Sequence, residues 1–224
     1  MLLDKKETKL TIAGPVGELE AALTNVDATL TFAEGLLAGK HLLVIICHPH
    51  PQQGGTMDNK VVTTLLRTYR DIGIQVLRFN FRGVGKSEGV FDNSVGELDD
   101  LFAVIHWVKN TLPDYAILLA GFSFGSSIAA RASYYVDGLV HLTLVAPPVE
   151  RYAYDRNGKF TAPVCIVQGD QDELVNANGV YAWVAGLEGA VALIRYPAAG
   201  HFFHGCLSTL KADLTEKLLT QIKP

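Results

Sequence analysis

The segment Ala116-Ile117-Leu118-Leu119-Ala120-Gly121-Phe122-Ser123-Phe124-Gly125 says more about the fold than any other part of this chain. Its first half is an apolar run that predicts a buried strand, and its second half fits the pattern Gly-x-Ser-x-Gly. Because Gly121 and Gly125 are small, the chain can turn sharply from strand into helix and hold Ser123 strained, with its hydroxyl above the edge of the sheet. A serine in that position can attack a carbonyl carbon, so Ser123 is the candidate nucleophile.

Length and composition predict one domain that spans residues 1–224. The chain has 224 residues, of which 49% are hydrophobic, enough for one sizeable core but short for two. Its net charge of −4 arises from 19 basic and 23 acidic residues with no long run of either sign. Neither nucleic acid nor an anionic membrane surface is therefore expected as a partner.

Cysteine usage and the N-terminal sequence predict a cytoplasmic protein. Cys47, Cys165 and Cys206 are odd in number, and the first two lie in or at the end of apolar runs where a thiol behaves as a small hydrophobic group. Residues 1–7 mix both charges and include no apolar stretch long enough for a signal peptide. No segment approaches the roughly 18 uncharged apolar residues that a membrane span needs. The sequence does not indicate the oligomeric state.

Apolar runs alternate with segments of helical periodicity along most of the chain. This alternation predicts an α/β fold with a mostly parallel, twisted sheet of about eight strands and helices on both faces. The expected strands are residues 9–12 and 18–23, which form an opening antiparallel hairpin, and residues 41–47, 74–79, 116–120, 139–145, 164–168 and 191–196. The expected helices are residues 61–69, 95–110, a segment through 128–130, 180–187 and a closing helix through 207–218.

Polar residues mark the starts of two expected helices. Asp58 or Asn59 can cap the helix through residues 61–69. Ser94 and Glu97 have the spacing of a capping box at the start of the helix over residues 95–110.

Three loops that follow expected strands carry the residues of a serine nucleophile and its activating pair. In a parallel sheet, ligand sites lie beyond the carboxyl ends of the strands. Ser123 is followed along the chain by the acidic loop 169–175 and the histidine loop 198–204. A serine hydroxyl needs an imidazole to take its proton, and the imidazole needs a carboxylate to fix its tautomer. The order serine, aspartate, histidine predicts that these loops converge.

Each of the two later loops offers two candidates. Asp170 or Asp172 could be the carboxylate, and an acidic residue after a strand commonly bonds its own backbone instead; we favour Asp172. His201 or His204 could be the base. His201 is favoured because it follows the flexible Gly200 and lies at the centre of its loop.

The loop after the strand 41–47 is expected to provide part of an oxyanion hole. One backbone N–H should come from Phe124, directly after the nucleophile, and one from this early loop. Pro49 and Pro51 have no N–H, so His50 is the expected donor and residues 52–55 are the alternatives.

No metal and no cofactor are expected. His48 and His50 lack the further His or Cys cluster that a zinc site requires. Residues 83–87 match neither phosphate-binding glycine pattern, because Asn80 and Glu88 stand where glycine is needed. We expect a turn there instead, ordered by Arg82.

Taken together, these residues make the chain resemble the α/β-hydrolase superfamily over essentially its full length, and within it a group of small, lidless bacterial serine hydrolases. The resemblance implies the triad Ser123, Asp172 and His201, because the family pattern Gly-x-x-Asp-x-x-Val fits residues 169–175 with Asp172 as the acid. The matching runs are His48-Pro49-His50-Pro51, Gly54-Gly55-Thr56-Met57, Arg78 to Gly85, Gly121 to Gly125 and His201-Phe202-Phe203-His204.

The resemblance implies an open site and a small-molecule acyl substrate. Residues 146–163, where many relatives insert a lid, are too few for packed helices. Tyr152, Tyr154 and Phe160 are candidate walls of the site or else packing residues. The expected reaction is hydrolysis of small acyl esters or thioesters through an acyl-enzyme. An acyltransferase with the same triad and a catalytically silent binding protein on this fold are the alternatives.

Overall fold

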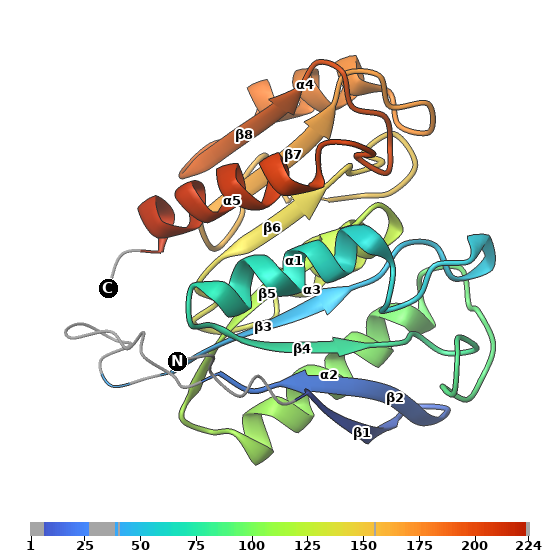
Figure 1. Cartoon of the computed structure of the whole chain (residues 1–224). Coiled ribbons are helices and arrows are strands. Elements are labelled where there is room, and N and C mark those ends of the chain that lie inside the picture. Colours follow the sequence, from blue (N-terminus) through green and yellow to red (C-terminus); the bar gives the residue numbers. More distant parts are fainter. Residues whose placement is uncertain (1–6, 27–38, 40, 155, 223–224) are drawn as a thin grey trace.

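In the computed structural model, which describes residues 7–26, 39, 41–154 and 156–222, one sheet of eight strands runs through the molecule (Figure 1). The strand order is β1-β2-β4-β3-β5-β6-β7-β8. The strands are β1 (Glu7–Gly14), β2 (Gly17–Thr24), β3 (His41–Cys47), β4 (Gln75–Phe79), β5 (Tyr115–Phe122), β6 (Leu142–Val145), β7 (Val164–Gly169) and β8 (Val191–Tyr196).

The sheet is mostly parallel, as the sequence predicts. β1 and β2 form the expected antiparallel hairpin, and β2 also pairs antiparallel with β4. Every other neighbouring pair is parallel. The carboxyl ends of β3, β5, β7 and β8 therefore meet at one edge, where the loops with the candidate residues begin.

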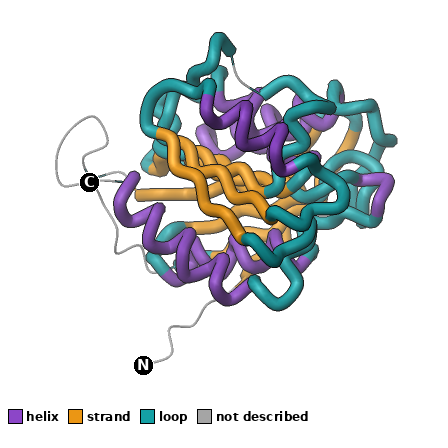
Figure 2. The backbone as a smooth tube through the Cα atoms, turned by 90° about the horizontal axis from the view of Figure 1, so that it is seen from above, coloured by secondary structure: helices purple, strands orange, loops and turns teal. Residues whose placement is uncertain are grey.

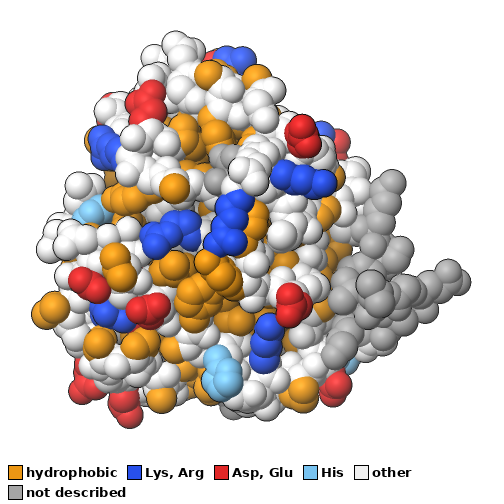
Figure 3. Space-filling model, turned by 180° about the vertical axis from the view of Figure 1, so that it is seen from behind, with side chains coloured by type: hydrophobic (Ala, Val, Ile, Leu, Met, Phe, Trp, Pro, Cys, Tyr) orange, Lys and Arg blue, Asp and Glu red, His pale blue; other side chains and the backbone are white. Residues whose placement is uncertain are grey.

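Helices cover both faces of the sheet (Figure 2). α1 and α5 pack on one face, and α2, α3 and α4 pack on the other (Figure 1). The face seen in Figure 3, which α2 and α3 cover, mixes basic, acidic and hydrophobic side chains. The helices are α1 (Lys60–Asp71), α2 (Gly96–Thr111), α3 (Phe124–Ser133), α4 (Ala177–Ala185) and α5 (Leu207–Gln221), and a short 3-10 helix covers Pro51–Gln53.

The central strands are hydrophobic throughout because both of their faces are buried. In β3, Leu43 and Ile45 pack with the residues of α2 and α3, whereas Val44 and Ile46 pack with those of α1 and α5. All four side chains are fully buried. Such continuous apolar runs are typical of parallel strands between two helical layers.

The helix starts follow the sequence only in part. Asn59 caps α1, because its side chain accepts a hydrogen bond from the N–H of Val61 at 2.9 Å. Of the two hydrogen bonds expected in the capping box, one is present: Glu97 accepts from the N–H of Ser94 at 2.7 Å. The other is not, because the Ser94 side chain does not cap the start of α2. Ser94 has a φ of 70°, and its carbonyl and hydroxyl oxygens accept from Arg131 instead.

The loop between β6 and β7 has no helix in its described residues, in agreement with the predicted absence of a lid. No helix in the described ranges combines the length and the apolar character needed to cross a bilayer.

Candidate active site

Ser123 occupies the sharp turn between β5 and α3. Its backbone has φ 52° and ψ −121°, a conformation that costs a residue with a side chain on the order of 1–3 kcal/mol. The turn requires glycine at position 121, because a Cβ there would lie 2.3 Å from the carbonyl oxygen of Gly125. The strand-to-helix turn predicted from the sequence is therefore present at Ser123.

His201 and Asp172 lie next to Ser123 in a continuous chain of hydrogen bonds. Nε2 of His201 is 3.0 Å from Oγ of Ser123, and Nδ1 of His201 is 2.8 Å from Oδ2 of Asp172. The side chains of His201 and Asp172 are 3% and 0% exposed. The three residues favoured from the sequence therefore meet although they are far apart along the chain.

The Asp172 carboxylate is buried and strongly hydrogen-bonded. Burial on its own would raise the pKa of Asp172, but the hydrogen bond and charge of His201 and the two backbone donors outweigh it and lower the pKa below its usual value. Those donors are the N–H groups of Leu174 and Val175, at 2.9 and 2.8 Å from Oδ1. Oδ1 thus binds the loop while Oδ2 faces His201.

Asp170 has a different set of partners. Tyr181 donates to its Oδ1, and Nη2 of Arg195 lies 2.8 Å from its Oδ2. These hydrogen bonds, that of Arg195 first, lower the pKa of Asp170. His204 is exposed, and its ring lies near Phe202. Asp170 and His204 are therefore not in the hydrogen-bond chain that ends at Ser123.

Two backbone N–H groups beside the candidate nucleophile have no acceptor among the described residues. These are the N–H groups of His50 and Phe124. Three of the alternative donors in the early loop are occupied: Gln52 donates to Nδ1 of His50, and Gln53 and Gly55 donate to the His50 carbonyl. The rings of His50 and Phe124 lie 5.1 Å apart.

The early loop is fixed directly against the turn at Ser123. A Cβ at Gly125 would lie 2.4 Å from the carbonyl oxygens of both Cys47 and His48, so only glycine fits there. The buried His48 ring contacts the Pro49 carbonyl through Nδ1 at 2.6 Å and accepts from the N–H of Phe81 through Nε2 at 3.0 Å. Burial lowers the pKa of His48 to about 4, so its ring is neutral and links two loops.

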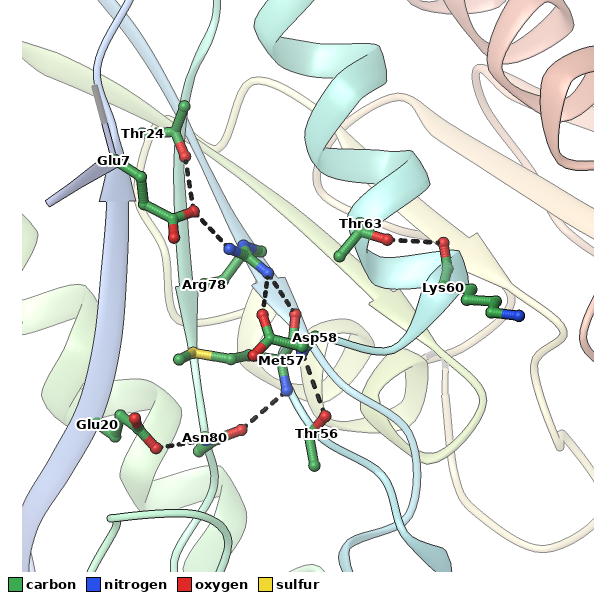
Figure 4. A network of polar contacts seen from close by, with 10 residues as sticks. All are labelled: Glu7, Glu20, Thr24, Thr56, Met57, Asp58, Lys60, Thr63, Arg78 and Asn80. Atoms are coloured by element: carbon green, nitrogen blue, oxygen red, sulfur yellow. Dashed lines mark hydrogen bonds and ion pairs between the residues drawn. The ribbon is translucent and has the colours of Figure 1, made fainter. Parts of the chain in front are cut away.

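A polar network around Arg78 holds the segment between the early loop and α1 (Figure 4). Arg78 Nη1 donates to the Met57 carbonyl at 2.7 Å and to Asp58 at 2.8 Å, and its Nη2 donates to Glu7. Asn80 accepts from the N–H of Met57 at 2.8 Å. Asp58, a possible helix cap from the sequence, is thus an ion-pair partner of β4 instead.

The loop 83–87 is a turn after a strand, as predicted. Arg82 orders it through a buried pair with Asp100, in which Nη2 lies 2.7 Å from Oδ1. The Arg82 N–H also donates to Asp100 at 2.9 Å.

Of the three candidate wall residues, Tyr152 alone lies at the site. Its half-buried ring is 5.7 Å from that of Phe124. Phe160 is buried against Trp183. Tyr154 is also buried, and its hydroxyl is 2.7 Å from Oγ of Ser126. Tyr154 and Phe160 are therefore packing residues.

Sequence reasoning missed three residues that support the hydrogen-bond chain. Ser126 Oγ donates to the carbonyl of Ser123, and a serine in the first turn of a helix is a signal that could have indicated this bond. Glu173 accepts from the N–H of His201 at 3.1 Å, and Gln168 donates to Asp172 at 3.1 Å. The Glu173 contact joins two separate loops and leaves no local pattern, whereas the Gln168 contact runs from the end of β7 to the loop that follows it.

The described residues contain no group of three His, Cys, Asp or Glu side chains that could hold a metal ion. The described side chains at the site are those of Ser123, His201 and Asp172, with the free backbone N–H groups of His50 and Phe124 nearby.

This fold and site define an α/β-hydrolase, an enzyme class built on a mostly parallel sheet with a serine at the turn after a central strand. The comparisons with known proteins agree. The family model for an alpha/beta hydrolase domain matches residues 41–216, and the chain belongs to that family.

Relatives with solved structures match the chain over nearly all of its length. An alpha-beta serine hydrolase homologue from Coxiella burnetii is 41% identical, with a TM-score of 0.85 over 97% of this chain and 99% of that one. A serine hydrolase without a lid from Xanthomonas campestris is 38% identical, with a TM-score of 0.85 over 100% and 99%. An uncharacterised protein of Rickettsia prowazekii is 34% identical over 80% of this chain and 79% of its own length.

Proposed function

We propose that this enzyme is a serine hydrolase that cleaves small acyl esters or thioesters through an acyl-enzyme on Ser123. The observation that carries the proposal is the hydrogen-bond chain from Ser123 through His201 to Asp172. Each of the three residues lies at the carboxyl end of a strand or in the loop after it. This is the arrangement that nucleophilic acyl transfer requires.

In the first half of the proposed reaction, Ser123 Oγ attacks the carbonyl carbon of the ester while Nε2 of His201 takes its proton. The leaving alcohol or thiol departs with the proton that His201 returns, and an acyl-Ser123 ester remains. In the second half, His201 takes a proton from water, which attacks the acyl-enzyme, and then returns it to Ser123 Oγ as the acid is released. Asp172 stabilises the imidazolium and fixes its tautomer in both halves.

The free N–H groups of His50 and Phe124 support a role as oxyanion donors. A tetrahedral intermediate places negative charge on the former carbonyl oxygen, and preorganised N–H donors stabilise that charge. Both groups lie beside Ser123 and have no acceptor in the described part of the chain.

A chain-length series of para-nitrophenyl esters tests the proposed function. We expect the highest kcat/KM with acetyl to butyryl groups, because the described residues of the loop 146–163 form no helix that could enclose a long chain. We also expect an initial burst of nitrophenol, because the acyl-enzyme accumulates. No activation is expected above the micellar concentration of a long-chain ester, since no cover has to open. A preference for long chains, interfacial activation or no hydrolysis of any ester would contradict the proposal.

The His50→Ala variant tests the backbone role of His50. Alanine retains the N–H but removes the ring, which accepts from Gln52 and packs on Phe91. We expect kcat to fall less than about tenfold, whereas loss of an oxyanion donor costs roughly 10²–10³-fold. EDTA should leave the wild-type rate unchanged. A loss of 10²-fold or more in the variant, together with inhibition by EDTA, would indicate a metal ligand instead.

A further inference from the structure

Arg151 lies between two parts of the proposed site. It belongs to the loop between β6 and β7, and its Nη2 donates to the carbonyl of Leu174, in the loop after β7, at 3.2 Å. The next residue, Tyr152, has its ring 5.7 Å from the ring of Phe124, the residue after the candidate nucleophile. The guanidinium is therefore at the rim of the site, between the acid loop and the oxyanion side.

A cavity of about 310 Å³ opens beside Arg151, lined by residues 148–151 and 172–176. Three carboxylates line this wall, those of Glu150, Asp172 and Glu173, and all three already accept hydrogen bonds from the protein. Glu150 accepts from Nδ2 of Asn176 at 2.8 Å, and Glu173 accepts from the N–H of His201 at 3.1 Å. Within the described ranges, no carboxylate forms an ion pair with Arg151.

Two charged groups, Glu97 and Arg151, act on the His50 ring, and only the second is exposed. Burial lowers the pKa of His50, the charge of Glu97 raises it, and the charge of Arg151 lowers it. Glu97 is fully buried and holds the N–H groups of Asp92 and Ser94, so a substrate cannot reach its carboxylate. Arg151 is exposed, and among the described residues its guanidinium donates to the Leu174 carbonyl alone.

We propose that Arg151 binds a carboxylate group of the substrate, so that the preferred substrates are esters that carry a free carboxylate in addition to the bond that is cleaved. This inference rests on the proposed function. A guanidinium presents paired N–H donors that match the two oxygens of a carboxylate. Leu174, in the same wall, is 42% exposed and offers an apolar contact to the organic part of such a substrate.

Two matched pairs of esters test the inference. In the first pair the charge is on the acyl group: mono-para-nitrophenyl adipate against para-nitrophenyl hexanoate. In the second it is on the leaving group: para-acetoxybenzoate against its methyl ester. In at least one pair we expect Arg151→Gln to lower the ratio of charged to neutral kcat/KM about tenfold, through KM, as loss of one charge-assisted hydrogen bond predicts. Arg151→Lys should lower the ratio less.

Arg156→Gln is the matched control. Arg156 is also exposed, but its guanidinium lies over the rings of Tyr134 and Tyr135, at 4.9 and 4.8 Å from their centroids. The same net charge is lost, so the ratio should stay within twofold of the wild-type value. Equal ratios in Arg151→Gln and wild type for both pairs, or the same fall in Arg156→Gln, would overturn the inference.

Calorimetric binding separates failure of this inference from failure of the proposed function. The Ser123→Ala protein is titrated with both charged esters, with and without Arg151→Gln, so no turnover is needed. A Kd that is about tenfold weaker in the double variant supports the carboxylate site, even if no ester is cleaved by the wild type. Equal Kd values, or no measurable binding to Ser123→Ala, would overturn it.

Discussion

Ser123→Ala is expected to lower ester turnover about 10⁴- to 10⁶-fold, the largest effect of any single substitution in this enzyme. The Ser123 hydroxyl forms its hydrogen bond with His201, and alanine removes that oxygen while leaving the backbone of the turn unchanged. The variant should therefore fold normally, with an unchanged circular dichroism spectrum. It should also lose covalent labelling by a fluorophosphonate, which is measured as a mass shift.

Ser133→Ala provides the matched control for this experiment. Ser133 is a buried serine at the other end of α3 and donates to the carbonyl of Ala130. Its replacement should leave turnover within about threefold, since a lost hydrogen bond of this kind affects stability by roughly 1 kcal/mol. Near wild-type turnover in purified Ser123→Ala would refute the assignment of the nucleophile.

Asp172→Asn is expected to reduce kcat by about 10⁴-fold, through the wrong imidazole tautomer. The asparagine carbonyl can still accept from Leu174 and Val175, so the loop should keep its shape. Its amide, however, would present a donor to Nδ1 of His201, where the carboxylate now accepts. Steady-state kinetics with a para-nitrophenyl ester measure the loss.

Asp170→Asn distinguishes the two acids of this loop. Asp170 pairs with Arg195 and Tyr181, away from His201, so its replacement should cost far less activity. If Asp170→Asn lost more activity than Asp172→Asn, the carboxylate role would belong to Asp170.

The pattern of apolar residues predicts the bounds of the strands closely where those bounds are set by burial. The strand β3 has the expected bounds because an apolar run buried on both faces of a sheet ends where the chain leaves the core. The edge strand β8 also has the expected bounds, although it is only partly buried. β6 begins at Leu142 rather than at residue 139, although the N–H of Val140 already bonds the Ile117 carbonyl. Its regular pairing with β7 starts only at Leu142, and that pairing is not encoded in the apolar run.

The helix bounds depend more on tertiary contacts. α4 begins at Ala177, three residues before the expected start. The expected start was too late because Asn178 and Gly179, in the first turn of the helix, are residues typical of loops. The prediction of Ser94 as a cap is wrong because Arg131, on α3, donates hydrogen bonds to the carbonyl and hydroxyl oxygens of Ser94. No local pattern predicts such a contact.

The positions of the three candidate catalytic residues could be predicted because they follow from the topology of the sheet. Parallel strands bring Ser123, Asp172 and His201 to one edge of the sheet, so the topology was enough to select their three loops. The choice of Asp172 over Asp170 also needed the family pattern, and the choice of His201 over His204 its place in the loop. Their supports were not predictable from the sequence. The bond of Glu173 joins residues of different loops, and the position of Arg151 depends on how the loop 146–163 folds back.

The contact at Gly125 has a consequence for how the proposed oxyanion hole works. Because the turn at Ser123 and the loop after β3 touch backbone to backbone, neither can shift without the other. The N–H groups of His50 and Phe124 are thus oriented when the chain folds, before any substrate binds. We therefore expect the proposed oxyanion hole to be preorganised, so that little reorganisation energy is needed when the oxyanion forms and the reaction rate depends on the same backbone contact as the folded structure.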